Sequence, residues 1–189
     1  MACGEPRADG RQQDGGVPVS RHDRDGGVAD AAEVAALFAR SFTATFGHLY
    51  PPEDLAGFLA GCDGAAFAGE LADADHGFRL AFEGDALIGF VKLGPTALPI
   101  DRAGRRAIEL RQLYVDEAAK GLGVAAGLME WALAEAARRG MEDIYLTVWI
   151  DNHRARRFYE RYGFVEVGRY AFVVGGTIDD DRIMRLRLA

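Results

Sequence analysis

The chain has 189 residues, of which 49% are hydrophobic and 27% charged, a profile typical of one soluble globular domain. No stretch approaches the roughly 20 uncharged apolar residues of a membrane-spanning helix, and the N-terminus lacks a secretory signal, so neither a membrane partner nor export is expected. The 22 basic and 29 acidic residues give a net charge of −7, which disfavours nucleic acid as a partner. Cys3 and Cys62 are the only cysteines, so a reducing, cytoplasmic location is expected.

The chain divides into a short tail and a single domain. Residues 1–16 are rich in Gly, Arg, Asp and Gln and cannot offset their ordering entropy, which predicts a disordered N-terminal tail. Residues 17–189 form the expected domain. It begins with an edge strand at 17–21 and a loop at 22–27, after which Asp30 is predicted to cap a helix that reaches about Arg40.

The rest of the chain alternates between helical and strand periodicity. Short helices are predicted from Pro52 and at 65–73, and longer ones at 122–139 and 152–162. Strands are predicted for a hairpin at 77–82 and 86–93, after the loop 94–106 at 108–115, at the buried 144–149, and for a closing hairpin at 164–174 and 182–188. These elements predict an α/β fold of three layers, with a mixed central sheet flanked by helices.

A strand that ends in a glycine-bearing loop and opens a helix is the most informative stretch. Gly121 and Gly123 allow close backbone approach and direct successive N–H groups into one concavity. Those N–H groups and the helix dipole favour an anion such as a phosphate. Lys120 adds a mobile cation, and Val124 and Ala125 keep the first helical turn small. A plain glycine turn before a helix is the alternative, and neither the dinucleotide-binding nor the P-loop glycine pattern fits.

A second motif follows the buried strand at 144–149. Asn152 and Tyr159 lie seven residues apart, so both are expected on one face of a helix. Ala155, Phe158 and Tyr162 form a separate apolar stripe for the core.

The two motifs together, K-G-L-G-V-A at 120–125 and N-x-x-A-x-x-F-Y-E-x-x-G-F at 152–164, resemble the GNAT superfamily of acyl-CoA-dependent N-acetyltransferases. The order of strands and helices matches from about residue 17 to the end, which implies a GNAT-type, mostly antiparallel sheet. Residues 45–50, 172–176 and 181–184 resemble more narrowly the branch that contains bacterial spermidine/spermine N-acetyltransferases.

This resemblance implies an acetyl-CoA cosubstrate and a binding site for it. Backbone groups of Leu113, Tyr114 and Val115 would pair with the pantetheine arm, and Asn152 would hydrogen-bond it. Tyr159 would lie near the thioester sulfur. The superfamily usually has Gln or Arg at the position of Lys120, and a lysine lacks their planar donor geometry. The pyrophosphate would be held by the amides of one continuous run: Lys120, Gly121, Leu122, Gly123, Val124 and Ala125.

Acetyl transfer to an amine needs a base and an acid. An alkyl amine with a pKa near 10.4 is only about 0.04% neutral at pH 7, so a carboxylate or a water relay must take its proton. Glu109 is the candidate base, and its alternative role is an exposed carboxylate at a strand end. The Val115 N–H would stabilise the oxyanion, and the Tyr159 phenol would protonate the leaving thiolate.

Three further features bear on function. Asp179, Asp180 and Asp181 are most simply a polar turn, the alternative being the entrance for a cationic substrate. The basic helix around Arg154 is most simply a solvated face, with the 3′-phosphate of CoA as an alternative ligand. The four histidines are scattered without metal-ligand spacing, so no metal site is predicted.

The expected function is therefore acetyl-CoA-dependent N-acetylation of a primary amine of a small molecule, including a polyamine. Acetylation of a peptide or protein N-terminus, through a groove beside the loop 94–106, remains an alternative. A non-catalytic acyl-CoA-binding domain is a second alternative. The sequence leaves the acceptor, the acyl-chain preference and a homodimeric state open.

Overall fold

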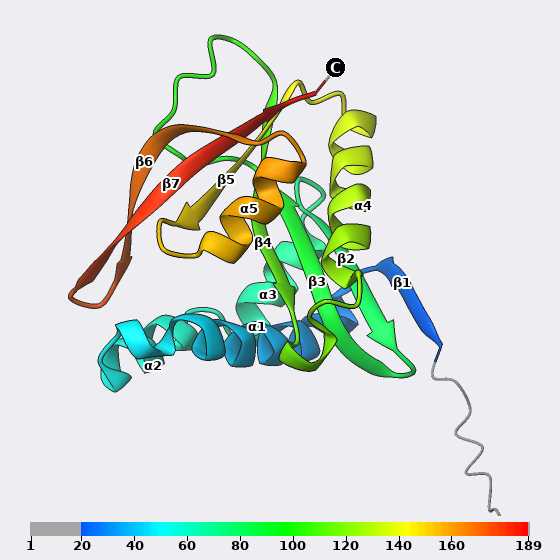
Figure 1. Ribbon diagram of the computed structural model, residues 1–189. Helices are drawn as coiled ribbons and strands as arrows, with labels where there is room; N and C mark the ends of the chain where they lie inside the picture. The colour runs from blue at the N-terminus through cyan, green and yellow to red at the C-terminus, as the bar shows by residue number, and fades with distance from the viewer. Residues whose placement is uncertain (1–19, 189) are drawn as a thin grey trace, which may run out of the picture.

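The computed structural model describes residues 20–188, which form one seven-stranded sheet with helices on both faces (Figure 1). The strand order is β1-β2-β3-β4-β5-β7-β6, and only β4 and β5 pair in parallel. The strands are β1 Arg21–Asp25, β2 Gly77–Glu83, β3 Ala86–Gly94, β4 Ala107–Val115, β5 Asp143–Trp149, β6 Val165–Val174 and β7 Thr177–Arg187. The α-helices are α1 Ala31–Phe46, α2 Pro52–Ala60, α3 Gly64–Ala72, α4 Val124–Arg138 and α5 His153–Arg161, and the 3-10 turns are η1 Val28–Asp30, η2 Gly47–Leu49 and η3 Glu117–Ala119. The three-layer, mostly antiparallel fold expected from the sequence is confirmed.

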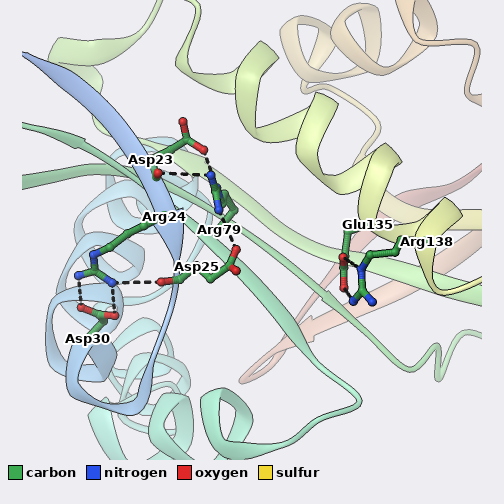
Figure 2. A network of polar contacts seen from close by, with 7 residues as sticks. All are labelled: Asp23, Arg24, Asp25, Asp30, Arg79, Glu135 and Arg138. Carbon is green, nitrogen blue, oxygen red and sulfur yellow. Dashed lines mark hydrogen bonds and ion pairs between the residues drawn. The ribbon is translucent and has the colours of Figure 1, made fainter.

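The N-terminal strand is displaced from its expected position. The predicted loop 22–27 is wrong for most of its length, because Arg21–Asp25 pair with Glu83–Arg79 as an edge strand. Arg79 of β2 explains the register, since it lies between Asp23 and Asp25 and pairs with both (Figure 2). Residues 17–19 of the expected strand and the predicted tail 1–16 lie outside the described residues.

Asp30 is the N-cap residue of α1, as predicted, but its side chain makes no capping hydrogen bond to that helix. Its carboxylate accepts hydrogen bonds from Arg24 at 2.7 and 2.8 Å (Figure 2) and from the Gly27 N–H at 2.9 Å. These bonds close the turn η1 ahead of the helix. The helix then continues past the expected end at Arg40 to Phe46, because Ser41 and Phe42 also face the core.

Two hydrophobic cores occupy opposite faces of the sheet. The first core packs α4 and α5 on the sheet and contains Leu128, Met129 and Phe164. The second core packs α1, α2 and α3 on the other face, and its buried side chains include Phe38 and Phe67. Phe38 contacts the Tyr114 ring edge to face, with ring centroids 5.2 Å apart. The α1 helix is thereby fixed against β4, the strand that carries the predicted site.

The sheet splits between β4 and β5. Their parallel pairing covers only Ala107–Asp143, Ile108–Ile144 and Glu109–Tyr145. Beyond Glu109, β4 continues to Val115 along β3 and β5 continues to Trp149 along β7. Arg105 fixes the closed end, because its guanidinium contacts the fully buried Asp143 carboxylate at 2.6 Å. The two diverging strands therefore open a cleft in the middle of the sheet.

The closing hairpin is longer than the sequence predicted. The expected polar turn at 179–181 is wrong, because β7 already begins at Thr177 and the turn consists of residues 175 and 176. Asp54 of α2 supports this tip by accepting a hydrogen bond from the Gly176 N–H at 3.1 Å. Figure 1 shows the tip of the β6–β7 hairpin above α2. The three aspartates consequently lie in a strand.

One stretch among residues 20–188, Pro52–Ala72, has the length and mean hydropathy of a candidate membrane span. In the structure it consists of α2 and α3, each nine residues long and separated by residues 61–63. A helix of nine residues is only about 14 Å long, less than half of a bilayer core. Neither helix is long enough to cross a bilayer by itself.

Candidate functional site

A cavity of about 810 Å³ occupies the cleft between the diverging ends of β4 and β5. It extends from the loop before α4 to the β6–β7 hairpin. All but one of the residues that the sequence predicted for the site line this cavity: Glu109, Leu113, Tyr114, Val115, Lys120, Gly121, Gly123, Val124, Ala125, Asn152 and Tyr159. The exception is Leu122, whose side chain is half-exposed and does not line the cavity. The fold thus brings two motifs from different parts of the chain to one place.

The loop before α4 is shaped by two glycines in the left-handed region. Gly121 has φ of +87° and Gly123, the N-cap of α4, has φ of +84°. The first N–H groups of any helix lack partners inside it, so Val124 and Ala125 present theirs at this end of the cavity. Among residues 20–188, no acceptor lies within hydrogen-bond distance of the N–H groups of Gly121 and Gly123 either. This end of the cavity therefore offers several unpaired donors to an anion.

Two residues of the loop differ from their expected roles. The Leu122 N–H donates to the Ala119 carbonyl at 3.3 Å, and the Leu122 carbonyl accepts from Arg21 at 2.8 Å. Lys120 pairs with Glu117, and its N–H donates to the Glu117 carbonyl. Both residues thus serve the loop's own structure, and the anion-facing donors come from the glycines and the first turn of α4.

The exposed edge of β4 forms one wall of the cavity. Leu113, Tyr114 and Val115 pair with β3 on one side and face the cleft on the other. The Tyr114 ring packs on Phe38 and Phe90 in the second core. By the alternation of an antiparallel ladder, its backbone groups face Phe90 of β3, whereas those of Leu113 and Val115 face the cleft. A strand edge without a neighbouring strand presents backbone donors and acceptors to an extended ligand.

Helix α5 contributes the opposite wall. Asn152 is its N-cap, and the side-chain oxygen accepts from the Ala155 N–H at 3.1 Å. Tyr159 is 8% exposed and contacts Phe158 and Phe164. Burial raises the pKa of the Tyr159 phenol, because the tyrosinate anion is poorly solvated there. Tyr159 is therefore a neutral hydrogen-bond donor at physiological pH.

Glu109 lies at the point where β4 and β5 separate. Its side chain is mostly buried, accepts a long hydrogen bond from the Ala97 N–H at 3.4 Å and lies 4.0 Å from the Arg111 guanidinium. The sequence alternative of an exposed strand-end carboxylate is wrong, because Glu109 is only 9% exposed. The carboxylate faces the cavity at the base of the cleft.

The acidic end of the cavity corresponds to the alternative that the sequence offered for residues 179–181, an entrance for a cationic substrate, rather than to the preferred polar turn. Asp179 and Asp181 of β7 are 8% and 7% exposed and line the cavity. Asp179 accepts a hydrogen bond from the hydroxyl of the buried Tyr50. Burial and the neighbouring Asp179 charge raise the pKa of Asp181 to about 7, although a hydrogen bond from Thr147 opposes this shift. Strand alternation from Thr177 would have placed both aspartates on the inner face with Ile183.

Aromatic side chains surround this acidic end. Phe42 stacks on Tyr50 with ring centroids 6.0 Å apart, and Phe58 contacts Phe172 at 5.7 Å. Two buried polar atoms that lack partners among residues 20–188, Ser41 Oγ and Gln112 Oε1, belong to residues lining the same cavity. The acidic end therefore combines carboxylates and apolar rings, which is a surface suited to an alkylammonium group.

Three arginines of α5, Arg154, Arg157 and Arg161, also line the cavity. The prediction that this helix face is simply solvated is therefore only partly right, because these three side chains also border the cavity. They give the side of the cavity along α5 a positive charge, opposite in sign to the end formed by β7.

Comparison with known proteins identifies the family. Residues 32–164 match the acetyltransferase (GNAT) family. An uncharacterized N-acetyltransferase of Mycobacterium tuberculosis is 34% identical over 158 residues, which cover 83% of this chain and 97% of that protein. A mycothiol acetyltransferase of Geodermatophilus obscurus is 38% identical over 90 residues, covering 47% of this chain and 28% of that protein.

Solved structures agree on the fold. The PaiA N-acetyltransferase of Thermoplasma acidophilum, in complex with coenzyme A, superposes with a TM-score of 0.71 at 20% identity and covers 89% of this chain and 99% of its own. Mutant forms of a spermidine/spermine N-acetyltransferase of Vibrio cholerae give 0.62 at 22% identity and cover 88% and 93%. The acetyl-CoA cosubstrate expected from the sequence is consistent with these findings. The chain belongs to the acetyltransferase (GNAT) family and is an N-acetyltransferase.

Proposed function

We propose that this protein transfers the acetyl group of acetyl-CoA to a primary amine of a small molecule. The observation that carries the proposal is the single cavity that joins unpaired backbone donors, a free strand edge, a buried tyrosine and three carboxylates. The sheet splits directly above Glu109, so donor and acceptor can approach each other from the two ends of the cleft.

The donor would lie along β4 and the loop before α4. Its pyrophosphate would accept hydrogen bonds from Gly121, Gly123 and the first turn of α4, where the helix dipole favours an anion. Its pantetheine arm would pair with the β4 edge at Leu113 and Val115 and contact Asn152. Similar structures from Thermoplasma acidophilum and Salmonella typhimurium hold coenzyme A and acetyl-CoA, respectively, which supports this donor.

The chemistry needs no covalent enzyme intermediate. Glu109 would accept the proton of the acceptor ammonium, directly or through water, and the neutral amine would attack the thioester carbon. The Val115 N–H would stabilise the oxyanion. Tyr159 would donate its proton to the leaving sulfur, and the proton that the nitrogen loses as the amide forms would return the phenol to its neutral state. Because burial raises its pKa, the phenol stays protonated until the thiolate forms.

The acceptor would be a small amine that enters at the acidic end. A polyamine is the first member of this class to test, because the buried carboxylates at that end favour cations. The arginines that line the α5 side, including Arg154, suit the 3′-phosphate of the donor. The two charged parts of the cavity thus match the opposite charges of the two substrates.

Release of the CoA thiol from acetyl-CoA tests this proposal with spermidine, spermine, small amines, amino acids and short peptides as acceptors. We expect release with small amines and a fall in kcat of about 100-fold in Glu109→Gln, the size of a lost general base. Glu130→Gln is the matched control, because Glu130 lies on the exposed face of α4.

The other outcomes discriminate between the remaining functions. Release with peptides alone would identify a peptide N-terminal acetyltransferase. An increase in Tm with acetyl-CoA but no release with any acceptor would indicate a non-catalytic acyl-CoA-binding domain.

A further inference from the structure

We infer that Asp179 and Asp181 form a cation-binding subsite that selects acceptor amines carrying a second positive charge. This inference rests on the proposed function and assigns its substrate class: diamines and longer polyamines are preferred over monoamines. The subsite would hold the distal ammonium while the other nitrogen reacts.

The two carboxylates share one face of β7. Residues two apart on a strand point to the same side, and both aspartates are more than nine-tenths buried where they line the cavity. Asp180, between them, faces outward and pairs with Arg182. The strand therefore separates one compensated carboxylate on its outer side from two on its inner side.

The other buried charges in the described part of the chain differ from this pair, because each has an oppositely charged neighbour. Lys92 contacts Glu70 at 2.8 Å, Asp143 contacts Arg105 at 2.6 Å, and Arg182 contacts Glu166 at 3.2 Å. Glu109 has Arg111 at 4.0 Å. These four pairs show that the fold ordinarily compensates a charge that it buries.

Asp179 and Asp181 have no such neighbour. Within residues 20–188, no lysine, arginine or histidine nitrogen lies within 4.0 Å of either carboxylate. Their hydrogen-bond partners are the uncharged hydroxyls of Tyr50 and Thr147. Two buried like charges without a counter-ion are costly, and a cationic ligand offsets that cost directly.

The surroundings favour an organic ammonium over a metal ion. Among the described residues, no group of three or more His, Cys, Asp or Glu side chains is arranged to hold a metal. Tyr170, Phe172 and Trp149 line the same cavity, and aromatic faces attract alkylammonium groups. Ser41, another buried residue of the cavity wall, has a hydroxyl oxygen without a hydrogen-bond partner among residues 20–188.

Three acceptors with the same number of carbon atoms differ in the charge at the distal end: 1,4-diaminobutane, butan-1-amine and 4-aminobutanoate. They place an ammonium, a methyl group and a carboxylate, respectively, at the distal end. Wild-type protein should acetylate the diamine with a kcat/KM about 10- to 100-fold above that of the monoamine, the range expected for one charge-assisted contact. The anionic acceptor should be the poorest of the three.

Four variants then test the assignment: Asp179→Asn, Asp181→Asn, the double variant and the control Asp180→Asn. Each inner substitution should lower kcat/KM for the diamine by about tenfold and leave that for the monoamine within about threefold. The double variant should abolish the preference and improve the use of 4-aminobutanoate. Asp180→Asn removes the same charge one residue away, from the outer face, and should leave the preference intact.

Calorimetric titration of full-length protein loaded with CoA gives a readout that does not require turnover. 1,4-Diaminobutane should bind to the wild type and to Asp180→Asn, and bind at least tenfold more weakly to Asp181→Asn. Acetylation without a diamine preference, or a preference that persists in a folded double variant, would overturn the subsite. If no amine is acetylated, the proposed function fails, and the titration alone then supports or overturns the subsite.

Discussion

The two ends of the cavity are built in different ways. At the donor end, the continuous run of residues 113–125 supplies a strand edge, two glycines in the left-handed region and a helix N-terminus. This end of the cavity therefore presents mainly backbone groups to a ligand. At the acceptor end, side chains from α1, β5 and β7 converge, and the hydrogen bond from Tyr50 to Asp179 spans 129 positions of sequence. Backbone groups do not depend on side-chain identity, so they suit a donor that is the same for every acceptor. A site made of side chains can be altered by substitution to suit a different acceptor.

Tyr159→Phe should have the largest effect and should act at the donor end only. The substitution removes the hydrogen bond to the leaving sulfur while keeping the ring that packs on Phe158 and Phe164. We expect kcat to fall by about 100-fold for every acceptor, with the ratio of diamine to monoamine unchanged. Steady-state CoA release measures both quantities.

The control is Tyr162→Phe, which removes a phenol hydroxyl one turn further along, at the end of α5 and outside the cavity. Its kcat should match the wild type. A change in acceptor preference in Tyr159→Phe would contradict the separation of the two ends.

Gly123→Ala tests the donor end through the backbone. A Cβ at this position meets no atom within 4 Å, so the effect comes from φ of +84°, which costs a non-glycine residue about 1–2 kcal/mol. We expect the Kd of acetyl-CoA to rise about tenfold, because the loop relaxes away from the geometry that directs its N–H groups. Isothermal titration with CoA measures this change.

Gly127→Ala is a matched control on the same helix, since its Cβ also meets open space but its backbone is helical. It should raise the free energy of unfolding by about 0.5–1 kcal/mol and leave CoA affinity unchanged. Equal CoA affinities in the two variants would show that the left-handed conformation of Gly123 does not shape the site.

The donor end was predictable from sequence because its information is local. The glycine spacing, the strand before it and the helix after it predicted an anion-binding loop at residues 120–125. The structure places all of these residues except Leu122 in the lining of the cavity, and Leu122 and Lys120 use their backbone N–H groups inside the loop. Most helices and strands were predicted for the same reason, since their hydrophobic periodicity is contained within each segment. Edge strand β1 was misplaced because its charged residues lack that periodicity and Arg79 of another strand sets its register.

The acceptor end was not predictable in the same way. Three consecutive aspartates are typical of a turn by composition, and only the tertiary context converts them into a strand: Trp149 pairs with Asp181, and Tyr50 caps Asp179. The alternation that places Asp179 and Asp181 inward becomes visible only once the strand is known to begin at Thr177. Burial of polar residues depends on partners that no local pattern contains.

The pH dependence of acceptor choice should give the smallest effect and act only at the acceptor end. The pKa of Asp181 is about 7; burial and the charges of Asp179 and Asp180 raise it, whereas Thr147 and Arg182 lower it. Asp181 is therefore mostly protonated at pH 6 and ionised at pH 8. The ratio of kcat/KM for 1,4-diaminobutane to that for butan-1-amine should rise by up to about tenfold over this interval. The need to deprotonate the reacting amine affects both acceptors alike and largely cancels from the ratio.

Stability provides an independent check with a definite sign. Because the pKa of Asp181 in the folded protein lies above its unfolded value of about 3.9, the folded state binds more protons between about pH 4 and 7. This residue therefore lowers the free energy of unfolding as the pH rises through that window. Asp181→Asn lacks the titration, so it should match the wild type in Tm near pH 4, at the lower end of this window, and exceed it increasingly up to pH 8. Added 1,4-diaminobutane should raise the Tm of the wild type at pH 8 and so narrow the Tm difference between the wild type and Asp181→Asn. A Tm difference independent of pH would show that Asp181 does not carry the buried charge on which acceptor selection depends.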